Sequence, residues 1–142
     1  MKNLKKIKEV YEEDLCDNVE EVFETVRKNC LNNKFLESCG FVGIKNNRYI
    51  VQNAKNISTN PREEFLVDPL DYLSFKDKNK LISVYHSHID IDEKPSEYDI
   101  LISENCCVPF MIYSVITDKI GFYVPSNLEF EKDLIEDIKN NI

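Results

Sequence analysis

The feature that most restricts the fold is a mostly apolar segment, Leu81–Tyr85, that runs directly into His86-Ser87-His88. A short run of this kind between polar segments is typical of a buried strand. Alternate side chains of a strand project from the same face, so His86 and His88 would lie together while Ser87 points away. They are the only two histidines in the 142 residues. We therefore expect a central strand that ends in a pair of imidazoles.

Two imidazoles on one face predict a metal site if a carboxylate from a neighbouring element joins them. Three protein ligands, with a fourth position left for water, are typical of catalytic zinc. Two aspartates are candidates for the third ligand. Asp90 follows the second histidine in the next loop, and Asp99 lies just inside the next expected helix. The spacing alone does not choose between them.

Helical patterns occur on both sides of this strand. From Leu15 to Cys30, apolar residues recur every three or four positions, which predicts an amphipathic helix. The pair Asp68-Pro69 is typical of a helix start, with the aspartate as N-cap and proline in the first turn. We expect this second helix to direct Leu70 and Leu73 inward. A third helix is expected from Ser96.

Strands are expected at residues 41–44, 49–51, 65–67, 81–88, 110–116 and 120–124. Asn46-Asn47 fits the turn of the first hairpin, because asparagine tolerates the left-handed conformation. Ser126 and Glu129 form a capping-box pattern that would open a last helix. We divide the chain into an N-terminal extension (1–14), one α/β domain (15–125) and a C-terminal helix (126–142) packing on that domain.

The composition restricts the class of protein. Hydrophobic residues make up 42% of the chain, which is enough for a folded core, and the net charge of −8 does not suit a nucleic-acid-binding surface. The five cysteines form no Cys-x-x-Cys pair and are odd in number, which favours a reducing compartment. No segment has the length or apolarity of a signal peptide or membrane span. We therefore expect a cytoplasmic protein that binds neither nucleic acid nor membrane.

The spacing His86-x-His88, seven residues, Ser96, two residues, Asp99 resembles the JAMM motif of the MPN+ zinc metalloproteases. Upstream, the segment from Glu37 to Gly43 resembles the glutamate-bearing strand start of that family. The resemblance extends from about residue 15 to residue 124 and is greatest with short prokaryotic and phage members. It implies a JAMM/MPN fold, a mixed β-sheet flanked by helices, similar to cytidine deaminases. Ile89 departs from the proline that many members have after the second histidine.

The resemblance also implies a role for each residue of the motif. His86, His88 and Asp99 would bind one Zn²⁺ per chain, which favours Asp99 over Asp90. Glu37 would hold the attacking water and transfer its proton, since a base is still needed beside the metal. Ser96 would stabilise the oxyanion, although a serine at this position is also a common N-cap.

The function implied is zinc-dependent hydrolysis of a peptide or isopeptide bond in a protein or peptide substrate. The short members process ubiquitin-like or sulfur-carrier proteins, or act in phage tail assembly. The loop residues Asp90, Asp92 and Glu93 form an acidic rim that would prefer a basic substrate segment.

The scaffold role and the cysteines suggest alternatives to a metallopeptidase. A metal-free MPN-type scaffold that binds a protein partner is the main alternative, although a scaffold needs no complete ligand set. Cys39 would be a nucleophile if it paired with a histidine, but cysteine is more often a small buried apolar residue. The Cys106-Cys107 pair lacks the His-x-Glu and Pro-Cys-x-x-Cys signature of zinc deaminases.

Overall fold

The predicted central strand is β4 (Lys80–His88), which lies inside a mixed sheet. The computed structural model describes residues 12–128 and 132–142. Within these ranges six strands pair in the order β1-β3-β2-β4-β5-β6, and only the β4–β5 pair is parallel. The other strands are β1 (Glu13–Cys16), β2 (Cys39–Lys45), β3 (Arg48–Ala54), β5 (Phe110–Ser114) and β6 (Lys119–Tyr123).

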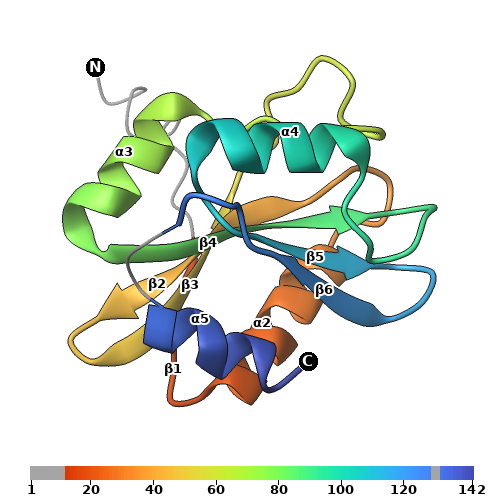
Figure 1. Cartoon of the computed structure of the whole chain (residues 1–142). Helices are drawn as coiled ribbons and strands as arrows, with labels where there is room; N and C mark the ends of the chain where they lie inside the picture. Colours follow the sequence, from red (N-terminus) through yellow and green to blue (C-terminus); the bar gives the residue numbers. More distant parts are fainter. Residues whose placement is uncertain (1–11, 129–131) are drawn as a thin grey trace, which may run out of the picture.

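Helices cover both faces of the sheet (Figure 1). Helices α2 (Val19–Leu31) and α5 (Lys132–Lys139) lie on one face, where Val22, Val26 and Ile138 join the core. Helices α3 (Pro69–Lys78) and α4 (Glu97–Cys106) lie on the other. There, Phe41, Phe75 and Phe110 belong to a second apolar cluster. The chain is therefore a single α/β domain with a mixed sheet flanked by helices, as predicted.

Local sequence signals account for several of these elements. Asn46 and Asn47 both have positive φ, at 50° and 63°, and form the tight turn between β2 and β3. The side chain of Asp68 accepts a hydrogen bond from the backbone N–H of Leu70 and caps α3, with Pro69 as the first helical residue. These features confirm the predicted hairpin turn and helix start.

The N-terminal boundary differs from the prediction. Residues from Leu15 were expected to begin a helix, but Glu13–Cys16 pair with β3 as an outer strand, and α2 begins at Val19 after the N-cap Asn18. Glu13 and Asp14, which we assigned to an extension, therefore belong to the sheet. Residues 1–11 of that extension lie outside the described residues.

The prediction of a strand at residues 65–67 is also wrong. Only Val67 forms a bridge, with Asn56. The side chain of Asn56 accepts from the N–H of Leu66 and donates to the carbonyl of Glu64, so a side chain takes hydrogen bonds that a neighbouring strand would otherwise make. This segment is a loop tied to Asn56.

Helix α3 presents a different face to the sheet than expected. Leu70 and Leu73 are 75% and 59% exposed, whereas Phe75 is buried and stacks on Phe41 with a ring-centroid distance of 4.9 Å. Two stripes at a spacing of three residues compete in this short helix, and the aromatic stripe of Tyr72 and Phe75 buries more surface. The inward orientation predicted for the two leucines is therefore wrong.

The C-terminal segment was predicted only in part. Ile135 and Ile138 are buried in α5, whereas Ile142 is exposed. The helix predicted to open at Ser126 is wrong at its start, because residues 126–128 are not helical and α5 spans Lys132–Lys139. The hydroxyl of Ser126 instead donates to Glu104 of α4. Glu129, the other residue of the expected capping box, lies outside the described residues. Within the described ranges, no helix is both long and apolar enough to cross a membrane.

The orientation of α3 leads to a stability prediction. We expect Phe75→Ala to lower the free energy of unfolding by about 3–5 kcal/mol, because it leaves a cavity beside Phe41. Leu73→Ala, on the exposed side of the same helix, should change it by less than about 0.5 kcal/mol. Chemical denaturation measures both values. A similar loss in the two variants would show that the exposed leucine packs in solution.

Candidate metal centre

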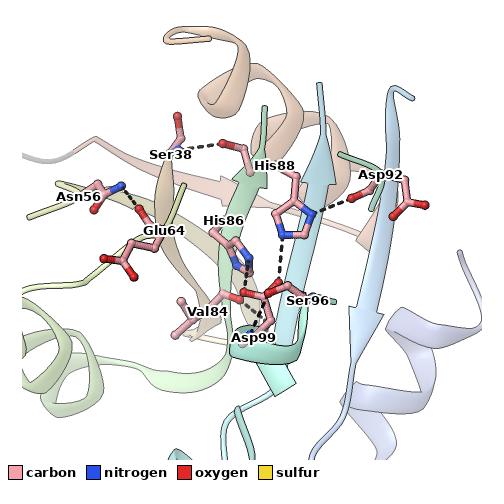
Figure 2. A network of polar contacts seen from close by, with 11 residues as sticks. Ser38, Asn56, Glu64, Val84, His86, His88, Asp92, Ser96 and Asp99 are labelled. Atoms are coloured by element: carbon pink, nitrogen blue, oxygen red, sulfur yellow. Dashed lines mark hydrogen bonds and ion pairs between the residues drawn. The ribbon is translucent and has the colours of Figure 1, made fainter. Parts of the chain in front are cut away.

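The end of β4 and the start of α4 meet at one point on the face that α3 and α4 cover. His86 and His88 both point toward Asp99 (Figure 2). Ser87, between them, faces the other way, where its hydroxyl accepts from the N–H of Ser38. Strand periodicity therefore places the two imidazoles together, as predicted.

Helix α4 brings Asp99 to the histidines through its N-terminal cap. The hydroxyl of Ser96 accepts from the N–H of Asp99 at 3.0 Å, and Asp99 Oδ2 accepts from the N–H of Ser96 at 2.9 Å. This reciprocal capping box fixes the carboxylate at the third helical position. The site thus depends on a short-range signal that also starts the helix.

Three potential ligand atoms converge in this arrangement. His86 Nε2 lies 3.0 Å from Asp99 Oδ1, and His88 Nε2 lies 3.0 Å from Asp99 Oδ2. One ligand atom from each residue falls within 4.8 Å of the others. All three residues are buried, at 0%, 2% and 4% exposure. Asp90 is exposed, so the carboxylate that joins the histidines is Asp99.

The hydrogen bonding of His88 indicates that a cation fits between these groups. Its Nδ1 lies 2.6 Å from the carbonyl oxygen of Asp92. A carbonyl only accepts, so Nδ1 carries the proton, and in the neutral ring Nε2 presents a lone pair to the Asp99 carboxylate. Two lone-pair donors at 3.0 Å repel each other unless a proton or metal ion lies between them. The donor set therefore suits a metal ion.

His86 supports the same conclusion from its surroundings. Phe65 stacks on its ring at 4.3 Å between centroids, and Phe110 contacts it edge-on at 5.4 Å. Its contact with Asp99 is close but lacks hydrogen-bond alignment, and both ring nitrogens are buried without a hydrogen-bond partner. Buried polar atoms are rarely left unpaired, and coordination would satisfy Nε2.

The charge states follow from these contacts. Burial lowers the pKa of His86, which favours a neutral imidazole. Burial opposes charge on His88 as well, but its hydrogen bonds to Asp99 and to the Asp92 carbonyl raise its pKa overall. Although burial alone would raise the pKa of Asp99, the two imidazoles beside it and the N–H of Ser96 hold that pKa well below the usual range. Asp99 is thus an anion that requires positive charge beside it.

Glu37 lies two residues before β2, the strand that pairs with β4. Cys39 is opposite His86 in the register, and continuing this antiparallel register by two residues places Glu37 opposite His88. The N–H of Glu37 donates to Pro61, and its carbonyl accepts from Asn56. Burial raises the pKa of Glu37 to about 8, while the charge of His88 acts in the opposite direction. Glu37 is therefore a buried carboxyl group under the influence of the site.

The structure supports the roles predicted for the remaining residues to different degrees. Ser96 acts as N-cap, and its catalytic role stays a prediction. Cys39 is buried, and burial with nearby Glu37 raises its thiol pKa to about 12, so the nucleophile hypothesis is not supported. In the acidic rim, Asp92 accepts from the N–H of Lys94, and Glu93 accepts from Thr117. Two of its three carboxylates are thus engaged within the protein.

Several groups that shape the candidate site are not predictable from the sequence. The carbonyl of Asp92 carries no residue-type signal, because any residue supplies a carbonyl. Phe65 and Phe110 resemble ordinary core residues. Asn56, which the sequence shows only within a glycosylation-like motif, ties Glu37 to the loop at Glu64. The number of hydrogen bonds it makes is visible only in the fold.

The comparisons with known proteins give a partial similarity. No family model matches the chain. The tail tip assembly protein K of Escherichia phage N15 is 32% identical over 78 residues, which are 55% of this chain and 32% of that protein. The chain thus spans about a third of this curated relative. The solution structure of protein DSY2949 from Desulfitobacterium hafniense aligns with a TM-score of 0.49 and 24% identity, covering 74% of this chain and 76% of that one.

The raised pKa of Glu37 predicts how pH affects the metal-free protein. Between the unfolded value of about 4.3 and the folded value of about 8, the folded state binds more protons than the unfolded chain. The free energy of unfolding contributed by this group therefore falls as pH rises through that window. We expect Glu37→Gln, which cannot ionise, to lose less thermal stability over this range than the wild type in the presence of a chelator.

Thermal unfolding followed by circular dichroism measures this difference, with the exposed Glu63→Gln as control. Equal pH dependence in the wild type and Glu37→Gln would contradict the prediction.

Proposed function

We propose that this chain is a JAMM-type zinc metallopeptidase that hydrolyses a peptide or isopeptide bond in a protein substrate. The observation that carries this proposal is the convergence of His86, His88 and Asp99 at one buried point. The spacing of these residues, together with Ser96, resembles the family motif. Glu37 adds a buried carboxyl group from the segment just before β2, as the proposed reaction requires.

Zinc is the metal that we propose. Two nitrogen donors disfavour Mg²⁺ and Ca²⁺, which prefer oxygen ligands, whereas two imidazoles and a carboxylate suit catalytic zinc. The same donor set occurs in non-haem iron(II) sites, so metal content has to be measured. A bound zinc ion would lower the pKa of water at the site and polarise the substrate carbonyl.

The protein groups then have separate tasks. Glu37 would take a proton from the attacking water and pass it to the departing amine. A cation beside this carboxyl group would lower its pKa toward the ionised form that the first step needs. The Ser96 hydroxyl uses its oxygen as an acceptor in the helix cap. Its proton remains available to stabilise the oxyanion.

The substrate context that we propose is phage tail assembly. The similarity to tail tip assembly protein K favours this role over the processing of ubiquitin-like or sulfur-carrier proteins. The substrate would then be a structural protein with a peptide bond accessible to the end of β4.

Metal content is the first test. We expect about one zinc per chain by plasma mass spectrometry, and loss of that zinc in His88→Ala and Asp99→Asn. Asp90→Asn is the matched control, because Asp90 is the neighbouring exposed carboxylate, and it should keep the metal. Iron in place of zinc, or no metal after zinc is offered, would contradict the proposal. The second result would favour the metal-free scaffold.

Glu37→Gln tests the proton-transfer role. We expect it to retain zinc and to cleave about 10²- to 10⁴-fold more slowly, because the general base is lost while the metal ligands are kept. Cleavage is measured on a panel of linear peptides and lysine isopeptides by mass spectrometry. Wild-type rates in this variant would remove Glu37 from the mechanism.

Ser96→Ala separates capping from catalysis. Loss of the cap should cost about 1 kcal/mol of stability. Asn18→Ala removes the equivalent cap of α2 and should cost a similar amount. If Ser96 also stabilises the oxyanion, only Ser96→Ala should reduce cleavage, by about 10²- to 10³-fold. Equal activity of the two variants would limit Ser96 to its structural role.

A further inference from the structure

The loop of residues 89–95 connects the two halves of the candidate site. It begins after His88 and ends just before Ser96, where the capping box of α4 holds Asp99. Within this loop, the carbonyl of Asp92 accepts from His88 Nδ1 at 2.6 Å. The position of one loop carbonyl therefore determines which nitrogen of His88 faces the site.

A buried serine on β5 holds the loop on one side of Asp92. Ser114 lies opposite His88 in the parallel β4–β5 register and is completely buried. Its hydroxyl donates to the carbonyl of Ile91 at 2.7 Å and accepts from the N–H of Thr117 at 3.2 Å. In addition, the N–H of Val115 donates to the carbonyl of His88. The strand that flanks His88 thus also holds the residue before Asp92.

A glycine on β6 holds the loop on the other side. A Cβ added to Gly121 would lie 2.4 Å from the carbonyl oxygen of Glu93, so the loop rests directly on the β6 backbone. The side chain of Glu93 also accepts from the Thr117 hydroxyl at 2.8 Å. Ile91 and Glu93, the neighbours of Asp92, are therefore both anchored by the β5–β6 hairpin.

We propose that Ser114 and Gly121 are positioning residues that fix the tautomer and orientation of His88 by holding the Asp92 carbonyl. This inference rests on the proposed metal site. Neither residue touches the ligands' donor atoms. They act through the loop backbone, as outer-shell groups commonly do when they orient a metal-bound imidazole.

The test compares Ser114→Ala and Gly121→Ala with the wild type. We expect both variants to bind zinc about 10- to 100-fold more weakly in competition with a chromophoric chelator. We also expect the hydrogen-bonded Nδ1–H signal of His88 to weaken or disappear in ¹H–¹⁵N NMR spectra of the metal-free protein. A purely structural role would leave that signal in place. Thr117→Val removes the hydroxyl that donates to Glu93 of the same loop. Thr117 is exposed, so this variant should fold and should show the same two effects.

Two matched controls make the same kinds of substitution, serine to alanine and glycine to alanine, at positions that do not contact the loop of residues 89–95. Ser83→Ala removes another buried hydroxyl, which donates to the carbonyl of Pro109 at 3.0 Å. Gly43→Ala produces a similar clash, 2.5 Å from the carbonyl of Lys80, at the other end of β4. Both controls should lose stability but keep the zinc affinity and the His88 signal of the wild type.

The outcomes separate this proposal from the proposed function. Wild-type zinc affinity and an unchanged His88 signal in the Ser114, Gly121 and Thr117 variants would overturn the positioning role while leaving the metal site intact. If the wild type itself binds no zinc, the proposed function fails. The NMR signal then decides the positioning role alone, with its loss in these variants in support and its retention against.

Discussion

The carboxylate of Asp99 connects two parts of the chain that would otherwise be independent. It accepts from the N–H of Ser96 and so helps to begin α4, and it faces the two imidazoles at the end of β4. Burial makes this anion costly unless hydrogen bonds and positive charge surround it. The geometry of the site therefore follows from one requirement, the neutralisation of a buried carboxylate, and from the helix start that places it there.

Much of this arrangement was visible in the sequence because it depends on short-range rules. The period of two in a strand places His86 beside His88, and the asparagine pair and Asp68-Pro69 mark a turn and a helix start through local backbone preferences. Features that depend on competition between distant segments were not predictable. Whether Leu73 or Phe75 faces the sheet depends on which of them packs better against Phe41 of β2, and the ring of Phe75 stacks on that of Phe41.

The same distinction explains what was missed around the candidate site. Asp99 was preferred over Asp90 only through the family resemblance, since both spacings allow a carboxylate near the histidines. The fold brings Asp99 to the histidines and leaves Asp90 exposed. Backbone groups such as the Asp92 carbonyl leave no trace in residue type, and the side-chain hydrogen bonds of Asn56 replace a strand that an apolar run had suggested.

The outer strand β1 has a consequence for the behaviour of the protein in concentrated solution. A strand at the margin of a sheet offers unpaired backbone groups to other chains. Here that strand has four residues and includes Glu13 and Asp14, and Glu13 forms an ion pair with Lys45 of β2 at 3.6 Å. Short length and acidic side chains discourage another chain from adding a strand. At its β1 edge, the described sheet is thus poorly suited to pairing with another chain.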